Sequence, residues 1–491
     1  MDDLDHPPTR TKLRVLMMCT HEPRADPRVR WEAEAAPSRF NVTVLGFAHG
    51  APGGNIENAD CHESILLPPA DRSVVEYFWR LKQVVPSPFG ILFTVLLVLT
   101  SLPLALADQA TRLTALAVRR AIGRAAASTA SLPASATVPM LRTVRGGLLA
   151  RTYYVLSSLR RRFSPAAVLF WDVIRDMPEK PDIVHCNDLD TLLVGVLAKK
   201  RYGCRLIFDA HEYYPHSDPS GRWLDITFFS ILEQFLIRHA DAVVTVNPPL
   251  ADAIREAYGL PEVHAVANAE PWTGPRVRPL GTQMEQLAAG RCKFLFQGRF
   301  TPGRGIDELI TAWAKVDSTR AALFLRGPEN IWRRDAMTLA TELGLLDCGI
   351  YFLDAVTEDQ LIAAAAEADV GIIPYRPLII NDRLCCPNKL SQYLHAGLMV
   401  VANELTFVKS LLAEAKAGLT YDSATPDSFV KIVRRILDDP ELLRRSQQNA
   451  LRFARERFNW QIEGEKLYRL YDRPEPAVEV LSEPMIAPAA Q

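Results

Sequence analysis

Short apolar runs that recur along the chain, each followed by a segment with helical spacing, constrain the fold more than any other feature. The first series comprises LRVLMMC (13–19), VTVLGF (42–47), PDIVHCND (181–188), CRLIFDAHE (204–212) and DAVVTVN (241–247). Uninterrupted apolar strands separated by helices are typical of parallel sheets that helices cover on both faces. The series therefore predicts an α/β domain with a doubly wound parallel sheet.

A second series of the same kind begins with KFLFQG (293–298) and continues at 321–327, 350–354, 370–375 and 397–403. A chain of 491 residues is too long for a single hydrophobic core. We therefore expect two Rossmann-like domains that face each other across a cleft, the first at 12–275 and the second at 288–455. The tail 473–491 is rich in Pro and Ala and is expected to be disordered.

Charge and cysteine usage narrow the class of protein. The formal net charge is only −1, which argues against a general nucleic-acid binder. The eight cysteines form no C-x-x-C pair, so we expect reduced thiols in a cytosol-facing protein. The first residues, MDDLDHPPTRTK, contain no apolar core of a signal peptide, and we expect none.

The segment 72–176 interrupts the first series and differs from it. Residues 89–107 are 19 consecutive uncharged and mainly apolar residues, and the interval 109–171 holds ten arginines and no acidic residue. Arginines beside an apolar run are typical of an anionic lipid surface on the cytoplasmic side. We therefore predict a membrane-associating insert and a peripheral or monotopic protein on the cytoplasmic face of the membrane.

A single crossing of the membrane would separate the first strand from the strands with which it must pair. The apolar run must therefore return as a re-entrant hairpin or lie in the interface. The alternative is a buried helix pair in an enlarged first domain.

The stretch GRFTPGRG (298–305) carries two arginines on a short loop between a strand and a helix. Ligands of open α/β sheets bind beyond the carboxyl ends of the strands, where helix N-termini point their N–H groups. Guanidinium groups match phosphate oxygens, so Arg299 and Arg304 indicate a diphosphate site. The alternative is that both are solvated surface arginines.

Several segments together resemble the GT-B fold glycosyltransferases, specifically the retaining family 4 and its relatives. They are GRFTPGRGIDELI, CPNKLSQYLHAGLMVVAN, DPRVRWEAEA, PDIVHCNDLDTL and LIFDAHEYYP. The closing FNWQIEGEKLYRLYD is similar to the family's final helix, which implies a helix at 456–472 that crosses back to the first domain. The resemblance covers about 12–50 and 180–472 and leaves the predicted insert outside.

The resemblance implies roles for particular residues. Arg299 and Arg304 would hold the nucleotide diphosphate and stabilise it as it leaves, and His211 would lie near the reacting carbon of the donor sugar. The implied catalytic residues are therefore His211, Arg299 and Arg304. Tyr375 would border the base, Asn388 and Lys389 would lie beside the donor, and Gly397 and Leu398 would supply backbone contacts. The implied donor set is Gly298, Arg299, Arg304, Tyr375, Asn388, Lys389, Gln392, Gly397 and Leu398.

One departure from the family pattern concerns two glutamates eight residues apart, one near the sugar hydroxyls and one on the ribose. Gln392 occupies the second position and Leu384 the first, with Asp382 as a possible substitute. An amide accepts a hydrogen bond less strongly than a carboxylate. The departure leaves the donor sugar open.

We expect two segments to line the acceptor side of the cleft. The loop THEPRADPRVR (20–30) would contribute Glu22, Arg24, Asp26 and Arg28, and the end of the predicted strand at 181–188 would contribute Asp188. The alternative for the loop is a solvated surface. If the insert enters the membrane, the acceptor is a lipid-linked sugar or lipid phosphate, and the arginines would hold its phosphate. We expect no metal, because arginines already neutralise the diphosphate, and no cofactor beyond the nucleotide-sugar donor.

The sequence therefore predicts a retaining glycosyltransferase that moves a sugar from a nucleotide-diphosphate donor to a lipid-linked or membrane-surface acceptor. The first alternative is a non-catalytic GT-B protein that binds nucleotide sugar or scaffolds a membrane complex, which Gln392 favours. The second is a GT-B sugar-nucleotide epimerase, which leaves the insert unexplained.

Overall fold

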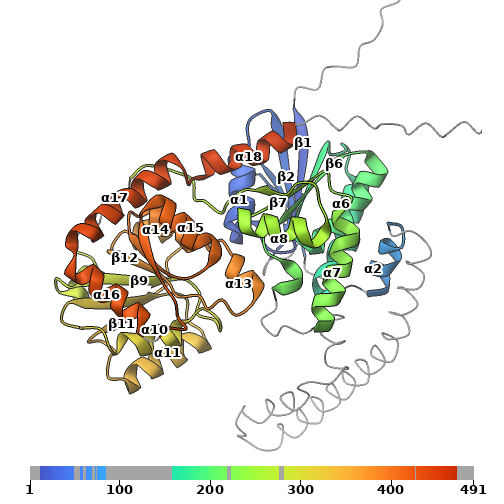
Figure 1. Ribbon diagram of the computed structural model, residues 1–491. Coiled ribbons are helices and arrows are strands. Elements are labelled where there is room, and N and C mark those ends of the chain that lie inside the picture. The colour runs from blue at the N-terminus through green and yellow to red at the C-terminus, as the bar shows by residue number, and fades with distance from the viewer. Residues whose placement is uncertain are drawn as a thin grey trace, which may run out of the picture.

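The computed structural model describes residues 12–48, 56–58, 62–68, 72, 74–84, 158–217, 223–275, 281–425 and 427–472. Within these ranges the chain forms two lobes, each built around one twisted sheet with helices on both sides (Figure 1). The first lobe precedes residue 275 and the second follows residue 281.

The sheet of the first lobe has the strand order β3-β4-β2-β1-β5-β6-β7-β8, and only β3 runs antiparallel to its neighbour. Its strands are β1 Leu13–Met18, β2 Phe40–Phe47, β3 Ile56–Asn58, β4 Glu63–Leu67, β5 Ile183–Asn187, β6 Arg205–Ala210, β7 Ala242–Thr245 and β8 His264–Ala265. Its helices are η1 Pro23–Ala25, α1 Pro27–Glu34, α2 Val74–Leu81, η4 Leu159–Phe163, η5 Ala166–Phe170, α5 Trp171–Asp176, α6 Leu189–Tyr202, η6 Tyr214–His216, α7 Trp223–Ile237 and α8 Pro248–Tyr258.

The sheet of the second lobe is fully parallel, in the order β11-β10-β9-β12-β13-β14. Its strands are β9 Cys292–Gln297, β10 Ala321–Arg326, β11 Ile350–Leu353, β12 Val370–Ile373, β13 Met399–Asn403 and β14 Gly418–Tyr421. The helices of this half are α9 Gln283–Ala288, α10 Ile306–Trp313, α11 Ile331–Glu342, η7 Glu358–Gln360, α12 Leu361–Ala365, α13 Ile380–Leu384, α14 Asn388–His395, α15 Thr406–Ala415, α16 Ser428–Asp438, α17 Pro440–Glu456 and α18 Trp460–Asp472.

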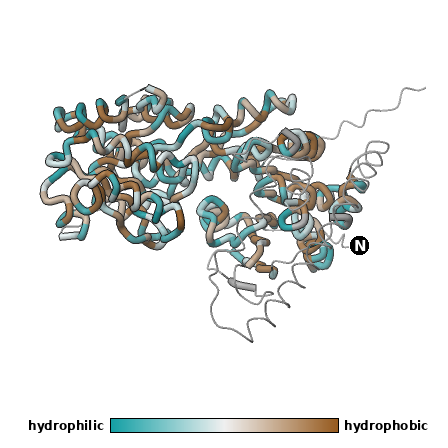
Figure 2. Tube along the Cα trace, turned by 90° about the horizontal axis from the view of Figure 1, so that it is seen from below, coloured by the Kyte–Doolittle hydropathy of each residue, from teal (hydrophilic) through white to brown (hydrophobic). Residues whose placement is uncertain are grey.

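Every apolar run of the two predicted series forms a strand in one of these sheets, so both series are confirmed. The strands that the sequence did not indicate are the short β3, β4, β8 and β14, all at or next to a sheet edge. Edge strands bury less apolar surface, so they carry a weaker hydrophobic pattern. Most helices alternate apolar and polar residues along the trace, as helices that cover a sheet with one face do (Figure 2).

Helix α18 leaves the second lobe and packs on the first sheet (Figure 1). Trp460 lies with its ring centroid 5.9 Å from that of Trp31 on α1. The hydroxyl of Tyr471 lies 2.7 Å from Nδ1 of the buried His185 on β5. The C-terminal helix therefore completes the hydrophobic core on one face of the first lobe.

The flanks of the predicted insert belong to the core of the first lobe. Leu159, Phe163 and Phe170 are fully buried, and the ring of Phe163 contacts Tyr77 on α2 and Phe229 on α7. The predicted membrane-associating insert 72–176 is therefore corrected at its C-terminal flank, because the buried side chains between 158 and 170 pack against protein. Residues 85–157, including the apolar run 89–107, lie outside the described residues.

No helix in the described parts of the chain has the length and apolar character needed to cross a membrane. The predicted disordered tail 473–491 lies outside the described residues.

Replacing Phe163 by Ala should lower the free energy of unfolding by about 3 to 5 kcal/mol, because it empties a fully buried aromatic site. Urea denaturation followed by tryptophan fluorescence measures this change. Trp79→Ala is the control on α2, since Trp79 is 67% exposed and its removal should cost less than about 0.5 kcal/mol. Equal stability of Phe163→Ala and the wild type would show that η4 does not belong to the core.

Candidate functional site

The carboxyl ends of the two parallel sheets face each other and contact directly. Asn381 on α13 accepts a hydrogen bond from the backbone N–H of Tyr213 at 3.0 Å and donates one to Glu212 at 3.1 Å. Asn247 donates to the carbonyl of Leu384 at 2.5 Å. Because ligands of open α/β sheets bind at this edge, the junction of the lobes is the candidate site.

Two glycines let the loop after β9 approach its neighbours closely. Gly298 has φ 143° and Gly305 has φ 69°, both in the region that favours glycine. A Cβ at Gly305 would lie 2.0 Å from the carbonyl oxygen of Pro374, and one at Gly298 would lie 3.3 Å from Nζ of Lys389. The loop that carries Arg304 is therefore pressed against the end of β12 and against α14.

A basic group forms where these elements meet. The guanidinium carbon of Arg304 lies 4.0 Å from the ring centroid of Tyr375, and the ammonium of Lys389 hydrogen-bonds to the hydroxyl of the same tyrosine. Lys389 is only 8% exposed, so burial lowers its pKa, and the nearby Arg304 lowers it further. Among the residues that the structure describes, no carboxylate lies within ion-pair distance of Lys389. Lys389 therefore has no counter-ion among these residues, whereas Arg304 lies within electrostatic reach of Asp382.

The remaining residues of the predicted donor set lie at different distances from this basic group. Arg299 is exposed on the same loop, and Asn388 begins α14. The backbone N–H groups of Gly397 and Leu398 already donate to Leu394 and Tyr393. Gly397 packs against α17 and Leu398 is buried, so the structure does not bring these two to the basic group, contrary to the expectation.

Gln392 has a carboxylate beside it. Its side-chain nitrogen lies 3.4 Å from a carboxylate oxygen of Glu270, which belongs to the segment after β8. The backbone N–H of Glu270 donates to Ser391 at 2.7 Å, which fixes that segment against α14. The sequence did not single out Glu270, because its neighbour on α14 lies more than 120 positions away.

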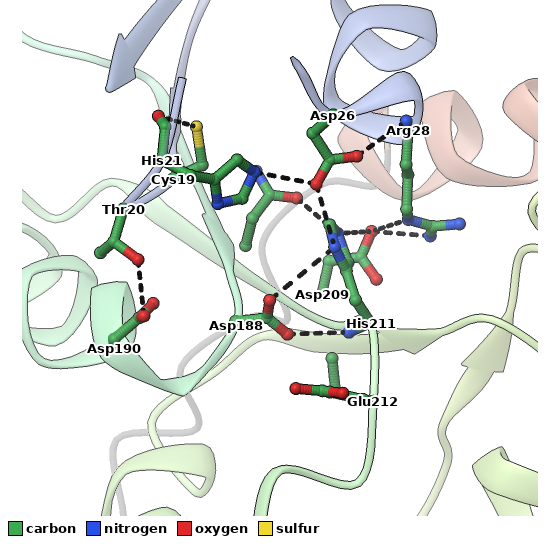
Figure 3. Close-up of polar contacts among 12 residues, drawn as sticks. Cys19, Thr20, His21, Asp26, Arg28, Asp188, Asp190, Asp209, His211 and Glu212 are labelled. Atoms are coloured by element: carbon green, nitrogen blue, oxygen red, sulfur yellow. Dashed lines mark hydrogen bonds and ion pairs between the residues drawn. The ribbon is translucent and has the colours of Figure 1, made fainter. Parts of the chain in front are cut away.

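The first lobe contributes a buried ion network beneath its strand ends (Figure 3). Arg28 is 2% exposed and donates from Nε and Nη2 to Asp209 at 2.8 and 2.7 Å. It also donates to the carbonyl of Val266 at 2.8 Å and to Asn268 at 3.0 Å. The expectation that Arg28 lines the acceptor side is corrected, because its guanidinium is buried inside the lobe and hydrogen-bonds to protein groups there.

Glu32, His185 and Asp209 are buried together and could in principle hold a metal ion. Arg28 already lies against two of them, with Nε 3.1 Å from Glu32. Burial raises the pKa of Glu32 well above its usual value, and the neighbouring Asp209 adds to this effect. Burial also lowers the pKa of His185. Arg28 therefore already supplies a positive charge to both Glu32 and Asp209.

Above this network, Asp26 lies between two imidazoles (Figure 3). Asp26 caps α1 through the N–H of Arg28, Nε2 of His21 lies 2.9 Å from its carboxylate, and Nδ1 of His211 lies 3.8 Å away. Burial opposes ionisation of Asp26, but the hydrogen bond from His21 and the charge of the imidazoles outweigh it and lower its pKa to about 2. Burial would lower the pKa of His21, but Asp26 raises it overall.

His211, the predicted catalytic histidine, is held by Asn187 at the end of β5 and by Asp188, the residue that precedes α6. Its Nε2 lies 2.9 Å from Oδ1 of Asn187, and its backbone N–H donates to Asp188 at 3.1 Å. Burial lowers the pKa of His211. Asp188 has φ 62° and ψ 165°, a strained conformation for a residue with a side chain. Such strain is common at functional sites, where the surrounding structure holds the residue in place.

Two acidic residues beside His211 resist ionisation. Burial raises the pKa of Asp188 well above its usual value, and the nearby Glu212 and Asp190 contribute. Burial likewise raises the pKa of Glu212. Perturbed carboxyl groups of this kind are typical of binding and catalytic sites. Of the other predicted acceptor-side residues, Glu22 is half-buried and Arg24 is exposed in the loop after β1.

The sequence assigned Arg162 to the arginine-rich lipid-facing interval, but the structure places it in the site. Its guanidinium lies 3.0 Å from Asp190 and 5.8 Å from the ring centroid of Tyr214. Thr20 donates to the same carboxylate oxygen of Asp190 at 2.6 Å. The sequence prediction left Arg162, Asp190 and Thr20 out of the site, although the acidic segment HCNDLD contains Asp190.

Solved structures share this two-lobed arrangement. Sucrose-phosphate synthase from Thermosynechococcus elongatus aligns with a TM-score of 0.62 at 15% identity, over 94% of this chain and 98% of its own. HepE of Anabaena, solved in complex with UDP and glucose, aligns with a TM-score of 0.59 at 13% identity, over 94% and 99%. Fold and site together define a GT-B protein with two Rossmann-like domains.

Family models match both lobes. Residues 121–269 match "Glycosyltransferase Family 4" and residues 291–439 match "Glycosyl transferases group 1". The chain therefore belongs to the GT-B glycosyltransferases of the family 4 type, which confirms the resemblance. The first match begins at 121, so the similarity extends into the predicted insert, which the sequence had left outside it.

Curated relatives share more sequence with this chain but match only part of their own length. D-inositol 3-phosphate glycosyltransferase of Corynebacterium efficiens is 28% identical over 255 residues, covering 49% of this chain and 58% of its own length. The lipopolysaccharide core biosynthesis glycosyltransferase LpsD of Rhizobium meliloti is 25% identical over 236 residues, covering 48% and 64%. In both cases the match spans less than two thirds of the relative.

The pair His21–Asp26 should stabilise the fold in a defined pH window. Its Asp26 part is present above the ordinary carboxyl value of 3.8 and is lost as the pH falls through the folded pKa of about 2. Its His21 part is present below the ordinary value of 6.5 and is lost as the pH rises through the raised pKa. The wild type should therefore exceed His21→Gln in unfolding free energy most between pH 3.8 and 6.5.

Urea denaturation of both proteins inside and above this window measures the difference. Asp26→Asn is the matched background, because asparagine still caps α1 but removes the charge. If His21→Gln keeps the same pH-dependent effect in that background, the pair is not its cause.

Proposed function

We propose that this protein is a retaining glycosyltransferase that moves a sugar from a nucleotide-diphosphate donor to a lipid-linked or membrane-surface acceptor, in polysaccharide or glycolipid biosynthesis. The observation that carries the proposal is the buried Lys389, which stands beside Arg304 with no described carboxylate as its partner. A donor diphosphate is the anion that fits this position.

The physical reason is the cost of burying an unpaired ammonium group, which is large unless an anion compensates it. A diphosphate at the ends of β9 and β12 would compensate both Lys389 and Arg304 and would meet the N-terminus of α14. Charge also builds on the diphosphate as the bond to the sugar breaks, so these cations would stabilise the leaving group. We propose that they make a metal cofactor unnecessary.

Two further observations support the donor and acceptor classes. HepE, a structural neighbour, was solved with UDP and glucose, and a neighbour from E. coli was solved with UDP-2-fluoro glucose. LpsD is named for lipopolysaccharide core biosynthesis. Together with the arginine-rich interval 109–171, these names support a nucleotide-sugar donor and an acceptor at an anionic membrane surface.

We propose further that Glu270 supplies the carboxylate that Gln392 lacks. Its carboxylate lies 3.4 Å from the amide nitrogen of Gln392, which stands one helical turn from Lys389 on α14. The pair thus presents an amide and a carboxylate beside the diphosphate site, and a carboxylate accepts hydrogen bonds from ribose hydroxyls strongly. This supports an active enzyme over a non-catalytic relative.

The test of function is the release of nucleoside diphosphate from a panel of UDP-, GDP- and dTDP-sugars by the purified full-length protein, with and without added membranes. Membrane-dependent release from one donor is expected. Lys389→Met should reduce kcat/KM about 10²-fold through loss of leaving-group stabilisation. Lys409→Met, on the surface of α15, is the control and should retain the wild-type rate.

Each other outcome contradicts part of the proposal. No release from any donor, while the nucleotides still bind, would favour the non-catalytic alternative. Release that needs only a water-soluble acceptor would contradict the membrane acceptor. Undiminished turnover by Lys389→Met would contradict its role at the diphosphate.

If Glu270 supplies the carboxylate, then exchanging the carboxylate of Glu270 with the amide of Gln392 should preserve binding of the nucleoside diphosphate. Glu270→Gln should weaken binding of the nucleoside diphosphate about tenfold, which corresponds to the loss of one charged hydrogen bond. The double variant Glu270→Gln with Gln392→Glu should recover most of this loss, because it restores one carboxylate and one amide. Isothermal titration with ribo- and 2′-deoxynucleotides measures both. A Glu270→Gln variant that still discriminates against the deoxynucleotide as the wild type does would contradict the proposal.

A further inference from the structure

The face of the first lobe that lies opposite the basic group carries excess carboxylates. Its charged and titratable groups come from the loop after β1, the ends of β5 and β6, and η4: His21, Asp26, Asp188, Asp190, Asp209, His211, Glu212, Arg28 and Arg162. Five of them are acids and two are arginines, and Glu22 and Arg24 in the loop after β1 add one charge of each sign. With every acid ionised, the face would therefore keep a net negative charge even if both histidines were protonated.

The arginines are already used. Arg28 forms an ion pair with Asp209 at 2.7 Å, beneath the face, and Arg162 forms one with Asp190 at 3.0 Å. Asp26 is balanced by His21 at 2.9 Å. Among the described residues Asp188 and Glu212 form no ion pair with a guanidinium or ammonium group. Arg162 acts on both only at longer range, and the imidazole of His211 lies 3.8 Å from Asp188.

The unpaired groups remain able to bind a ligand. The side chain of Asp188 is 15% exposed, and Glu212 uses one carboxylate oxygen to accept from Asn381 across the lobes. Asp190 is buried and paired with Arg162, so it contributes negative charge rather than a contact to a ligand. The face thus offers several acceptor oxygens, with imidazole nitrogens of His21 and His211 between them.

These groups differ in what they can recognise. A phosphate placed here would lie against the carboxyl groups of Asp188 and Glu212, and the guanidinium of this face, that of Arg162, is already paired with Asp190. Electrostatics therefore oppose a phosphate at this position. A ring with several hydroxyl groups donates to carboxylate oxygens and accepts from imidazole N–H groups. Carboxylates hold such hydroxyls strongly when the site is shielded from water.

We propose that the acceptor end that enters this site is an uncharged polyhydroxylated ring, a sugar without phosphate, which Asp188 and Glu212 hold through its hydroxyl groups. The proposal rests on the proposed function and names the class of its acceptor. It departs from the expectation that arginines hold a phosphate of the acceptor at the site. A phosphate on a lipid-linked acceptor would lie away from Asp188 and Glu212.

The test uses the full-length protein with the donor that gives nucleotide release and compares matched pairs of soluble compounds. Each pair contains a methyl glycoside of glucose, galactose or mannose and the same glycoside carrying a 6-phosphate. Each compound is assayed as an acceptor and as an inhibitor of membrane-dependent release. We expect the uncharged member of at least one pair to be used or to inhibit at a concentration at least tenfold lower than its phosphorylated partner.

Charge-removing variants link this preference to the face. Glu212→Gln keeps an oxygen that accepts from Asn381, and Asp188→Asn keeps the shape of the side chain. Each variant should reduce the ratio between the effective concentrations of the phosphorylated and the uncharged compound about tenfold. Glu256→Gln on α8 is the control, because Glu256 is 74% exposed and distant from the face in sequence and structure. Binding of the nucleoside diphosphate should not change in any of the three.

Equal or better use of the phosphorylated compounds would overturn the inference, as would an unchanged preference in both Glu212→Gln and Asp188→Asn. Failure of every compound to act as acceptor or inhibitor would also overturn it, because the face would then not select an uncharged ring. The absence of nucleotide release from any donor is a different result, which counts against the proposed function itself.

Discussion

The buried pair of Arg28 and Asp209 is the interaction on which the rest of the first lobe depends. The guanidinium joins α1 to the end of β6 and also reaches the segment after β8 through Val266 and Asn268. A buried charge pair gains little stability over apolar packing, yet removing either partner costs several kcal/mol. Here the pair holds α1, the end of β6 and the segment after β8 in fixed positions relative to one another.

The second lobe differs from the first, because its buried cation Lys389 has no carboxylate partner among the described residues. Lys389 and Arg304 share one tyrosine ring, and the glycine-bearing loop keeps both close to the ends of β9 and β12. Burial without a counter-ion destabilises the empty site and favours an anionic ligand. The two lobes thus meet with complementary charge, acidic on one side and basic on the other.

Much of the fold could be predicted from the sequence, because buried parallel strands leave long apolar runs such as 204–210 and 321–326. The roles of single charged residues could not. Arg162 looked like one member of a basic interval because its partner, Asp190, is distant in sequence. Gly397 looked like a ligand contact, but its positive φ serves the packing of α14 against α17. A sequence identifies the charged residues, but only the fold shows which groups lie next to them.

The path of the chain between the lobes has a mechanical consequence. The chain passes between the lobes twice, once after β8 and once before α18, and the two passages are bonded to each other, with the N–H of Trp460 donating to the carbonyl of Glu270 and that of Trp272 to Gln461. Because these passages are bonded to each other, we expect any relative movement of the lobes to be smallest beside them. Glu270 lies in one passage, so its contact with Gln392 would be retained during such a movement.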